Sequence, residues 1–514
     1  MPSLTKTPPT HGASPEEAVT LEITGLSHDG RGVARVDGLV AFIARALPGQ
    51  TVRARILRRK KAFVEGVSEA LLSPAEDAVP PLCPHHAECG GCPLQTMPYA
   101  EQLRRKRDIV LQAFTRMGRF DRARIDALLT GPEPSPLLAG FRNKITLAFG
   151  PDPEGGLALG QRAARSSRVI HTEGCMLLPR GMGELIAHVR DFCAQSGLPP
   201  YCPPSETERR GGRERGRGRG HGFWRALTVR CGCPPDVARG TDSGGASPAS
   251  PDAPGERLWL VCLTSPGDRS AERIVRRLAE DVLTHFPGVA GFVHEERRSD
   301  DALTGGEKRL FAMGRGSDDG DAALLALPLC GRFFTLDAAS FFQVNTQAAQ
   351  GLASTVRNML ENAARDLPTG RGGLLDLYCG VGAPGQLAAA HFAFTEEWEC
   401  DGRAAALARK NAENAGLARC ATHAGDAARA FAEAKVRACG AVLADPPRAG
   451  LSEKTLAGLL GLAPRHVVYV SCDPATLARD AARLSTGYEL KALATVDLFP
   501  HTPHVETVLL LSRS

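Results

Sequence analysis

Two segments near the C-terminal end carry residues that could do chemistry together. In VVYVSCDPATLARD (467–480) an apolar run stops just before Cys472, and the proline that follows suits the first turn of a helix. A helix N-terminus favours the thiolate, which is the nucleophilic form of cysteine. In DLFPHTPHVETVLLL (497–511), Glu506 and two histidines come at the start of a second apolar run. The sequence therefore predicts a nucleophile, Cys472, and a carboxylate base, Glu506, at one end of a sheet.

Two further segments predict a cofactor pocket at the same sheet edge. DLYCGVGAPG (376–385) indicates a strand, a glycine-rich turn that allows close approach of a ligand, and a helix. Glu399 ends the next expected strand and could accept two hydrogen bonds from ribose hydroxyls, as either a dinucleotide or S-adenosylmethionine would require. In ADPPRAG (444–450), Asp445 is a carboxylate placed to touch the cofactor or a base. Amino-methylating enzymes carry an aromatic residue after a similar turn, and Arg448 in its place argues against N-methylation.

A thiol and a carboxylate suffice for methyl transfer to C5 of uracil. Thiolate addition at C6 converts C5 into an enolate carbon that can attack an electrophilic methyl group. A general base then removes the C5 proton so that the thiol can leave. Enzymes that make 5-methylcytidine use a similar strategy, but they typically place a second cysteine near the proline-rich turn, and ADPPRAG contains none.

The stretch LCPHHAECGGC contains three closely spaced cysteines, Cys83, Cys89 and Cys92. In a cytosolic protein such a group indicates metal ligation rather than disulfides. Zinc and iron-sulfur sites both usually need four ligands, and Cys175 in HTEGCMLL is the best fourth candidate. A zinc site could instead be completed by the two histidines of CPHH.

Composition places further limits on the protein. The 514 residues are too many for one core, and the hydrophobic content of 43% indicates that most of the chain folds. No signal peptide and no run of about 18 apolar residues is evident, so we expect a cytoplasmic protein without a membrane partner. The basic residues cluster at Arg53–Lys61, Arg104–Arg107 and Arg209–Gly220, which favours a phosphate-rich partner such as RNA.

The elements that must position these residues form a multi-domain α/β chain. Short alternating segments predict a small antiparallel β-barrel of about five strands, whose basic run is followed by Phe63, as in single-strand nucleic-acid binders. A central α+β domain follows, with a helix predicted over Ala271–Leu283. Strands then alternate with helices as in a doubly wound parallel sheet, which binds ligands at the carboxyl ends of its strands. The predicted layout is a disordered N-terminus (1–17), the barrel (18–72), the central domain (73–335) with disordered insertions near 203–222 and 234–255, and the doubly wound domain (336–514).

The motifs together resemble the RNA uracil-5-methyltransferase family, which makes 5-methyluridine with S-adenosylmethionine. Besides the segments above, the resemblance rests on FRNKITLAFG (141–150), SFFQVNT (340–346) and an N-terminal part similar to a TRAM domain. It implies that Cys472 is the nucleophile and Glu506 the base. It also implies that Gln343, Tyr378, Glu399 and Asp445 contact S-adenosylmethionine and that Cys83, Cys89, Cys92 and Cys175 hold a [4Fe-4S] cluster.

The resemblance also implies the substrate. The TRAM-like segment with the cysteine cluster is similar to the bacterial members that act on 23S ribosomal RNA, whereas the tRNA enzymes lack both. Methylation of tRNA and a non-catalytic RNA-binding protein remain the alternatives, and no obligate protein partner is evident. Ala383 and Pro384 depart from the residues usual after GVG, so a cofactor hydrogen bond from side chain 383 is absent.

Overall fold

The structure is a computed structural model that describes residues 18–513, apart from 153, 165, 173, 179–181, 205–219, 236–255, 301–304, 316–319 and 369. The predicted disordered N-terminus lies outside the described residues, as do most of the two predicted insertions. The chain forms two compact units. The first comprises the described residues up to Pro81 with Pro93–Arg105 and His501–Pro503, and the second comprises the rest.

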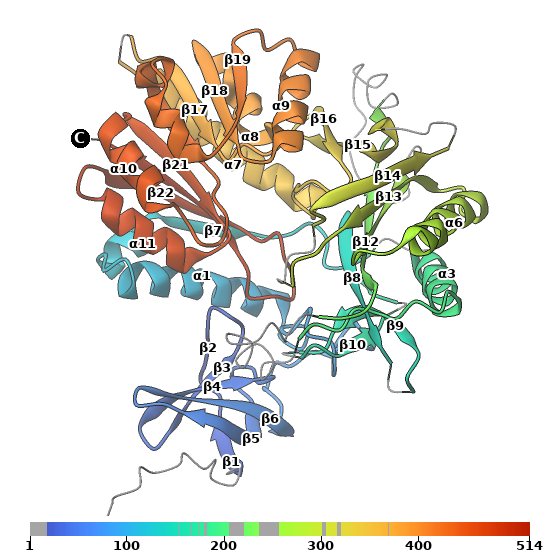
Figure 1. Ribbon diagram of the computed structural model, residues 1–514. Helices are drawn as coiled ribbons and strands as arrows, with labels where there is room; N and C mark the ends of the chain where they lie inside the picture. The colour runs from blue at the N-terminus through green and yellow to red at the C-terminus, as the bar shows by residue number, and fades with distance from the viewer. Residues whose placement is uncertain are drawn as a thin grey trace, which may run out of the picture. The chain divides into compact units, whose positions relative to one another are not determined.

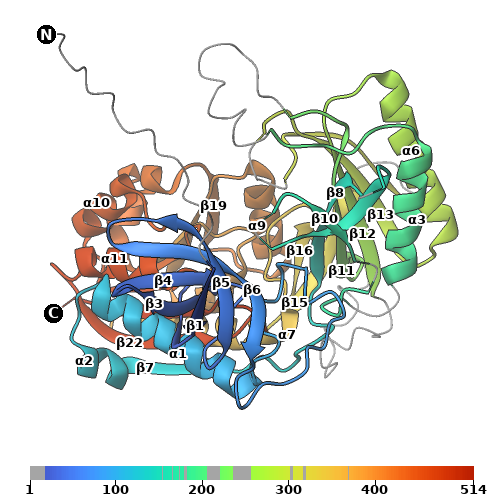
Figure 2. The ribbon, with the colours of Figure 1, turned by 90° about the horizontal axis from the view of Figure 1, so that it is seen from below.

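The first unit contains one curved six-stranded sheet with the order β1-β5-β6-β4-β3-β2 (Figures 1 and 2). Alternating apolar residues of these strands, among them Ile23, Ile43 and Val64, meet in its core. The two-residue strand β2 is the element that the pattern of about five strands did not predict. The strands are β1 (Ala18–Glu22), β2 (Gly25–Leu26), β3 (Gly32–Val36), β4 (Leu39–Ala44), β5 (Thr51–Arg59) and β6 (Phe63–Ser73).

Cationic and aromatic side chains share one face of this sheet, as predicted. The ring of Phe63 packs edge-on against Phe42, with 5.8 Å between the centroids. Lys60 lies 4.9 Å above Phe63, and the guanidinium of Arg31 lies 4.7 Å above Phe42. Such a face suits the backbone and bases of single-stranded nucleic acid.

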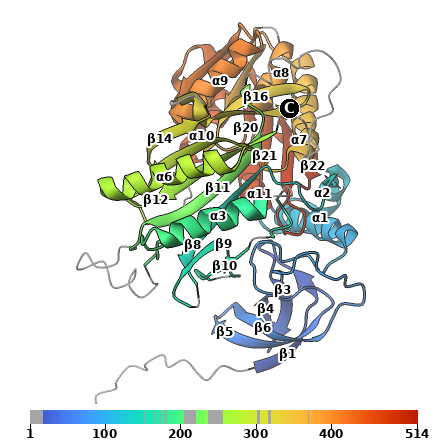
Figure 3. The ribbon, with the colours of Figure 1, turned by 90° about the vertical axis from the view of Figure 1, so that its right-hand side faces the viewer.

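The central part of the second unit is a seven-stranded sheet with the order β10-β9-β8-β11-β12-β13-β14. Helices α3 (Met182–Gln195) and α6 (Arg269–His285) cover one of its faces and share an apolar core with it (Figure 3). The sequence predicted the second helix over Ala271–Leu283, within these bounds. The strands are β8 (Lys144–Pro151), β9 (Leu157–Arg162), β10 (Val169–His171), β11 (Trp224–Gly232), β12 (Arg257–Thr264), β13 (Val289–Glu296) and β14 (Lys308–Gly314).

The C-terminal part is an eight-stranded sheet with the order β19-β18-β17-β20-β21-β23-β22-β7. Strands β17 to β21 are parallel, and β23 then pairs antiparallel with both β21 and β22. The strands are β7 (Leu129–Glu133), β17 (Gly373–Leu377), β18 (Phe394–Glu399), β19 (Cys420–Ala424), β20 (Cys439–Ala444), β21 (His466–Ser471), β22 (Glu489–Val496) and β23 (Glu506–Ser512). Edge strand β7 lies in the segment that the sequence assigned to the central domain, but it pairs in the C-terminal sheet. The central and C-terminal parts therefore do not divide at a single point of the chain.

Helices lie on both faces of this sheet, as a doubly wound fold requires. One apolar core joins the sheet to α1, α10 and α11, and another joins it to α7 and α8 (Figure 1). A hairpin of β15 (Leu324–Leu329) and β16 (Arg332–Asp337) precedes α7. The helices are α1 (Tyr99–Arg116), α2 (Arg122–Leu128), α7 (Thr346–Arg365), α8 (Ala383–Ala388), α9 (Gly402–Asn414), α10 (Glu453–Leu462) and α11 (Pro474–Leu484). Within the described part of the chain, every helix is too short or too polar to cross a membrane.

Candidate active site and cysteine cluster

The pairing of β21 with β23 brings the predicted nucleophile and base together. These antiparallel strands run in a register that sets Ser471 opposite Thr507. The same register, continued by one residue, sets Cys472 opposite Glu506 at the carboxyl end of β21. The two groups also interact electrostatically, since Glu506 raises the pKa of the Cys472 thiol.

The surroundings of Cys472 raise the pKa of its thiol, whereas a helix start by itself would lower it. The side chain of Asp473 takes the N-cap position of α11 and accepts from the backbone N–H groups of Ala475 and Thr476, at 2.9 and 3.1 Å. Burial, and then Glu506, raise the pKa of Cys472 to about 11. The carboxylate of Asp473 thus occupies the helix N-terminus, so the thiol keeps its proton near neutral pH.

Two buried carboxyl groups with raised pKa values and one guanidinium surround this thiol. Burial, followed by repulsion from Asp445, raises the pKa of Glu506 to about 8. Burial raises the pKa of Asp445, at the end of β20, to about 7. Arg448 acts in the opposite direction and lowers the pKa of both Cys472 and Glu506. The pKa of His504 is lowered to about 4, chiefly by burial, so its ring is neutral near pH 7.

The glycine-rich loop between β17 and α8 is shaped for close approach of a ligand. Gly380 and Gly382 have positive φ angles of 58° and 86°. A Cβ atom added at Gly380 would meet no protein atom within 4 Å, so this side of the loop is open. Asp376, at the base of the loop, is fully buried, and its Oδ2 has no hydrogen-bond partner among the described residues. Burial, and then the neighbouring carboxylates, raise the pKa of Asp376.

Three of the four predicted cofactor contacts lie around or near this loop. Glu399 ends β18, and its carboxylate accepts from the backbone N–H of Gly380 at 3.0 Å. Tyr378 adopts a positive φ of 64° directly before the loop, and its hydroxyl lies 3.3 Å from Thr455 Oγ1. Asp445 follows β20, the strand that pairs with β17, and its N–H donates to the Leu377 carbonyl at 3.3 Å. These positions are the carboxyl ends of adjacent parallel strands, where this fold binds ligands.

The fourth predicted contact, Gln343, lies in a turn that the central domain holds in place. Asn143 donates to the Gln343 carbonyl at 2.9 Å and to the Thr346 hydroxyl at 2.8 Å. Lys144 and Arg230 donate to the Ser340 carbonyl in the same turn. The side-chain amide of Gln343 makes no hydrogen bond to a described residue and so is available to a ligand.

The same turn presents Phe341, whose surface is 72% exposed. The turn that carries this exposed ring is fixed by two buried side chains, Asn143 and Arg230, and by the partly buried Lys144. Sequence reasoning quoted SFFQVNT but gave this ring no role; the doubled phenylalanine in a polar turn was the available signal.

The structure brings the four predicted cluster cysteines together. Cys92 and Cys83 are buried, and Cys89 and Cys175 are partly buried. Burial, followed by the other cysteines, raises the pKa of Cys92 to about 12. A buried guanidinium, that of Arg142, faces Cys92 and Cys175 and lowers the pKa of both.

The spacing of these sulfur atoms bears on the kind of metal site. Among the described residues, one group of three potential ligands has all its donor atoms within 4.8 Å of one another, and it consists of His188, Asp281 and His285. The cluster cysteines form no such compact group. Four thiolates around a single zinc ion would lie about 3.8 Å apart, given Zn–S bonds of about 2.3 Å. The arrangement is therefore wider than one zinc ion needs.

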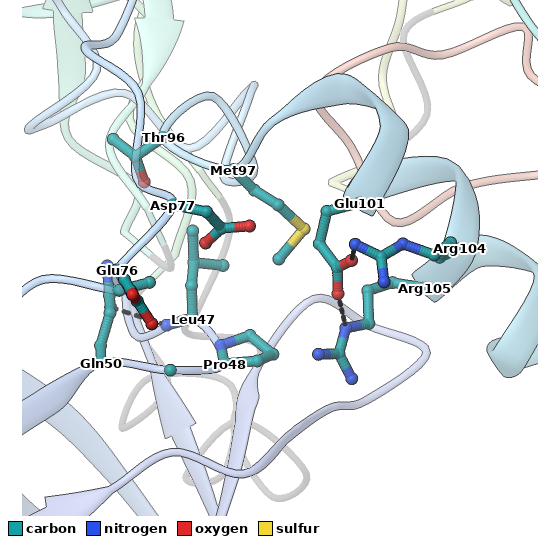
Figure 4. Close-up of a pocket in the computed structure, with 12 residues that line it drawn as sticks. Leu47, Pro48, Gln50, Glu76, Asp77, Thr96, Met97, Glu101, Arg104 and Arg105 are labelled. Carbon is teal, nitrogen blue, oxygen red and sulfur yellow. Dashed lines mark hydrogen bonds and ion pairs between the residues drawn. The ribbon is translucent and has the colours of Figure 1, made fainter.

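A cavity of about 570 Å³ in the first unit does not belong to either site (Figure 4). It is lined by Leu47 and Met97 together with charged groups, and none of the predicted catalytic, cofactor or cluster residues lines it. Its two arginines, Arg104 and Arg105, both pair with Glu101. Glu76 and Asp77 also line the cavity, so its three carboxylates outnumber its two guanidinium groups.

Sequence reasoning missed two residues that organise the active site. Arg448 had been noted as a departure from an aromatic pattern, but its charge faces both Cys472 and Glu506. Asp480 is fully buried in α11 and accepts from the Leu451 N–H at 2.9 Å, which ties the loop after β20 to the helix after β21. A single aspartate inside an amphipathic helix gives no sign of this in the sequence.

Comparison with known proteins agrees with the fold and the order of the motifs. The tRNA (uracil-5-)-methyltransferase family model matches residues 331–514, and the TRAM domain model matches residues 16–67. An RNA methyltransferase of Nitratidesulfovibrio vulgaris is 34% identical, with 96% of each chain covered. A protein of Alkalilimnicola ehrlichii named 23S rRNA (uracil(1939)-C(5))-methyltransferase RlmD is 32% identical, with 97% of each chain covered.

A solved structure extends the likeness to the three-dimensional fold. The Pyrococcus abyssi tRNA (uracil-54, C5)-methyltransferase, in complex with S-adenosyl-L-homocysteine, superposes with a TM-score of 0.65. The alignment covers 96% of this chain and 100% of that one, at 23% identity, so it bears on the fold alone. On the strength of the full-length relatives and the two matching models, the chain belongs to the family of S-adenosylmethionine-dependent RNA uracil-5-methyltransferases.

Proposed function

We propose that this enzyme methylates C5 of a uridine in 23S ribosomal RNA through a covalent adduct with Cys472. The observation that carries the proposal is the placement of Cys472 opposite Glu506 at the carboxyl end of β21. A thiol and a buried carboxyl group on the same side of one base are the two groups that C5 methylation needs.

In this mechanism Cys472 gives up its proton to Asp445 or to solvent as its sulfur bonds to C6 of the uracil ring. The electron pair of the C5–C6 double bond is then available at C5. When bound, S-adenosylmethionine supplies the methyl group that C5 takes up. Glu506 removes the C5 proton, the double bond re-forms, and the C6–S bond breaks to release the thiolate. The raised pKa of Glu506 suits this role because a carboxylate with a pKa of about 8 is a stronger base than an ordinary one.

We assign the cofactor pocket to the open side of the glycine-rich loop. Glu399 is placed to accept hydrogen bonds from ribose hydroxyls, and Gln343 and Asp445 supply polar groups on two neighbouring elements. Tyr378 adds an aromatic ring beside the loop. The open space at Gly380 and the raised pKa values of the nearby carboxyl groups both support a ligand here.

We assign a [4Fe-4S] cluster to Cys83, Cys89, Cys92 and Cys175. Four buried or partly buried thiols that face one another would repel as thiolates unless they bound a metal centre. Their wide spacing favours a multi-iron cluster over a single zinc ion. The buried Arg142 offsets negative charge at the site. Methyl transfer consumes no electrons, so the cluster would organise structure or position RNA.

The choice of 23S ribosomal RNA rests on the TRAM segment, the cluster cysteines and the full-length relative that is named for that substrate. Transfer RNA is the second candidate, because the matching family model and the Pyrococcus abyssi structure are named for it. Mass-spectrometric mapping of 5-methyluridine in both RNA pools, with and without this enzyme, distinguishes the two. Loss of one site in 23S ribosomal RNA is the expected result, and loss confined to tRNA would contradict it.

A further inference from the structure

A second cavity, of about 460 Å³, lies between α6 and strands β13 and β14 of the central domain. None of its lining residues belongs to the catalytic sheet or to the cysteine cluster, so methyl transfer does not account for it. Figure 3 shows α6 lying along one face of the central sheet. The side chains that matter here are Arg269, Glu272, Arg273, Arg276, His294 and Phe311.

Three arginines on one face of α6 give this cavity an excess of positive charge. Arg269, Arg273 and Arg276 are spaced at i, i+4 and i+7, so they project from the same side of the helix. None of the three forms an ion pair or hydrogen bond with a described residue. Glu272 is the single acidic side chain in the lining. The cavity in Figure 4 differs, because its lining has three carboxylates and two arginines, and both arginines pair with Glu101.

A buried histidine with an unused nitrogen forms part of the lining. His294 is fully buried, and its Nε2 lies 2.9 Å from Thr264 Oγ1. Its Nδ1 is buried and has no hydrogen-bond partner among the described residues. Buried polar atoms without partners are rare in folded proteins, so this atom is an unfilled hydrogen-bonding position in the wall of the cavity.

An aromatic ring fixes the positions of two of these groups. The guanidinium of Arg276 lies 4.5 Å above the Phe311 ring, and the His294 ring packs edge-on against the same ring at 5.3 Å. These contacts hold a cation and a hydrogen-bonding nitrogen in place before any ligand arrives. Arg269 and Arg273 are exposed and unpaired, and they continue the positive charge toward solvent.

We propose that this cavity binds a phosphodiester group of the RNA substrate and anchors it at a second point, on the central domain. Guanidinium groups match phosphate oxygens in geometry and charge, and the three arginines present them on one face of α6. A singly charged diester suits a cavity that also contains Glu272 better than a free phosphate dianion does. The proposal takes from the proposed function only that the ligand is RNA.

The test compares the full-length Arg269→Gln/Arg273→Gln double variant with an Arg277→Gln control. Arg277 is exposed on the same helix and does not line the cavity. Binding affinity is measured as a function of salt concentration for two RNAs, a 23S ribosomal RNA transcript and a hairpin of about 20 nucleotides. The hairpin is little longer than the RNA that a single OB-type module binds. Each lost phosphate contact weakens binding about fivefold at 0.1 M salt and lowers the salt slope by about 0.7.

We expect the double variant to bind the long transcript roughly 20-fold more weakly, with the salt slope reduced by about 1.4, and to bind the hairpin as the wild type does. The kcat of the double variant, measured on an RNA that the wild type methylates, should equal the wild-type value, while its KM for the long transcript should rise. Unchanged binding of the long transcript, or an equal loss in Arg277→Gln, would overturn the proposal. The proposal would also be overturned if the wild type bound inorganic phosphate tightly and the double variant lost that binding but still bound RNA as the wild type does. RNA binding and its salt dependence are measured without turnover. If the enzyme methylated no uridine, the proposed function would be refuted, but the binding experiment would still test the phosphodiester site.

Discussion

Cys472 lies opposite Glu506 because β21 and β23 are antiparallel neighbours in a sheet whose other central strands are parallel. In an all-parallel sheet the start of β23 would lie at the far edge from the end of β21. The reversed strand brings its first residue to the edge where β17, β18 and β20 present the predicted cofactor pocket. One change of strand direction thus places the thiol, the carboxyl group and the predicted cofactor pocket at the same edge.

Replacement of the base should separate adduct formation from product release. Glu506→Gln keeps the shape of the side chain but cannot accept the C5 proton, so the enzyme should become trapped after methyl transfer. We expect turnover to fall about 100- to 10,000-fold while a covalent enzyme–RNA complex accumulates on denaturing gels. Glu413→Gln, at an exposed position on α9, is the matched control and should retain full activity. A fully active Glu506→Gln enzyme would exclude Glu506 as the base.

The two raised pKa values predict a pH dependence with two separate phases. Only ionised Glu506 can act as a base, so product release should rise roughly tenfold between pH 7 and pH 9 and then level off, given a pKa of about 8. Adduct formation needs the Cys472 thiolate, whose pKa is about 11, so its rate should still rise above pH 9. Rapid-quench kinetics resolve the two steps. A release rate that does not change with pH would contradict the environment assigned to Glu506.

The same carboxyl group should affect stability in a pH-dependent way. Because folding raises the pKa of Glu506 from its ordinary value to about 8, the folded state binds this proton more tightly than the unfolded state does. The cost of ionising Glu506 is therefore absent below about pH 4 and grows until pH 8. Glu506→Gln removes it, so the variant should be more stable than the wild type by roughly 1–3 kcal/mol at pH 9 and by less at pH 6. Thermal unfolding of the wild type and the variant at pH 6 and pH 9 measures both differences in stability. A larger gain at pH 6 than at pH 9 would contradict the prediction.

Loss of one cluster ligand should remove iron without touching the thiol used in catalysis. Cys92→Ala leaves three cysteines around a centre that needs four, and we expect less bound iron and sulfide and a loss of brown colour in protein purified without oxygen. Cys400→Ala changes an exposed thiol outside the cluster and should retain both. A colourless wild-type protein with one zinc ion per chain would overturn the iron-sulfur assignment.

The exposed ring of Phe341 should act in RNA binding. Its side chain is held on a fixed turn next to Gln343, and stacking of a base on such a ring contributes about 1–3 kcal/mol. Phe341→Ala should raise KM for RNA by about 5- to 150-fold with little change in KM for S-adenosylmethionine, and Phe341→Tyr should restore it. Leu460→Ala, at an exposed apolar position on α10, is the control. Equal losses in Phe341→Ala and in the control would argue against stacking.

The sequence predicted the strands and helices with strong periodicity, and the fold brings the predicted nucleophile and base to one sheet edge. The helix predicted over Ala271–Leu283 and the strand before DLYCG lie where expected because apolar spacing determines both. Edge strand β7 was missed because LTGPE contains a glycine and a proline and pairs only with a strand more than 350 residues away. Asp473 caps α11, as the sequence indicates, but burial of the Cys472 thiol and its nearness to Glu506 depend on the packed sheet edge and raise the thiol pKa.

The central claim is that Cys472 forms a covalent bond to C6 of the target uracil, and 5-fluorouridine tests it most directly. Fluorine at C5 cannot be removed as a proton, so the adduct cannot resolve once the methyl group is in place. Wild-type enzyme with S-adenosylmethionine and 5-fluorouridine-substituted 23S ribosomal RNA should give a complex that survives denaturation, with the RNA on the peptide that contains Cys472. Cys472→Ala should give no complex and no 5-methyluridine in ordinary RNA, whereas Cys202→Ala, which changes a thiol of the central part, should behave as the wild type. A Cys472→Ala enzyme that still methylates RNA would contradict this mechanism.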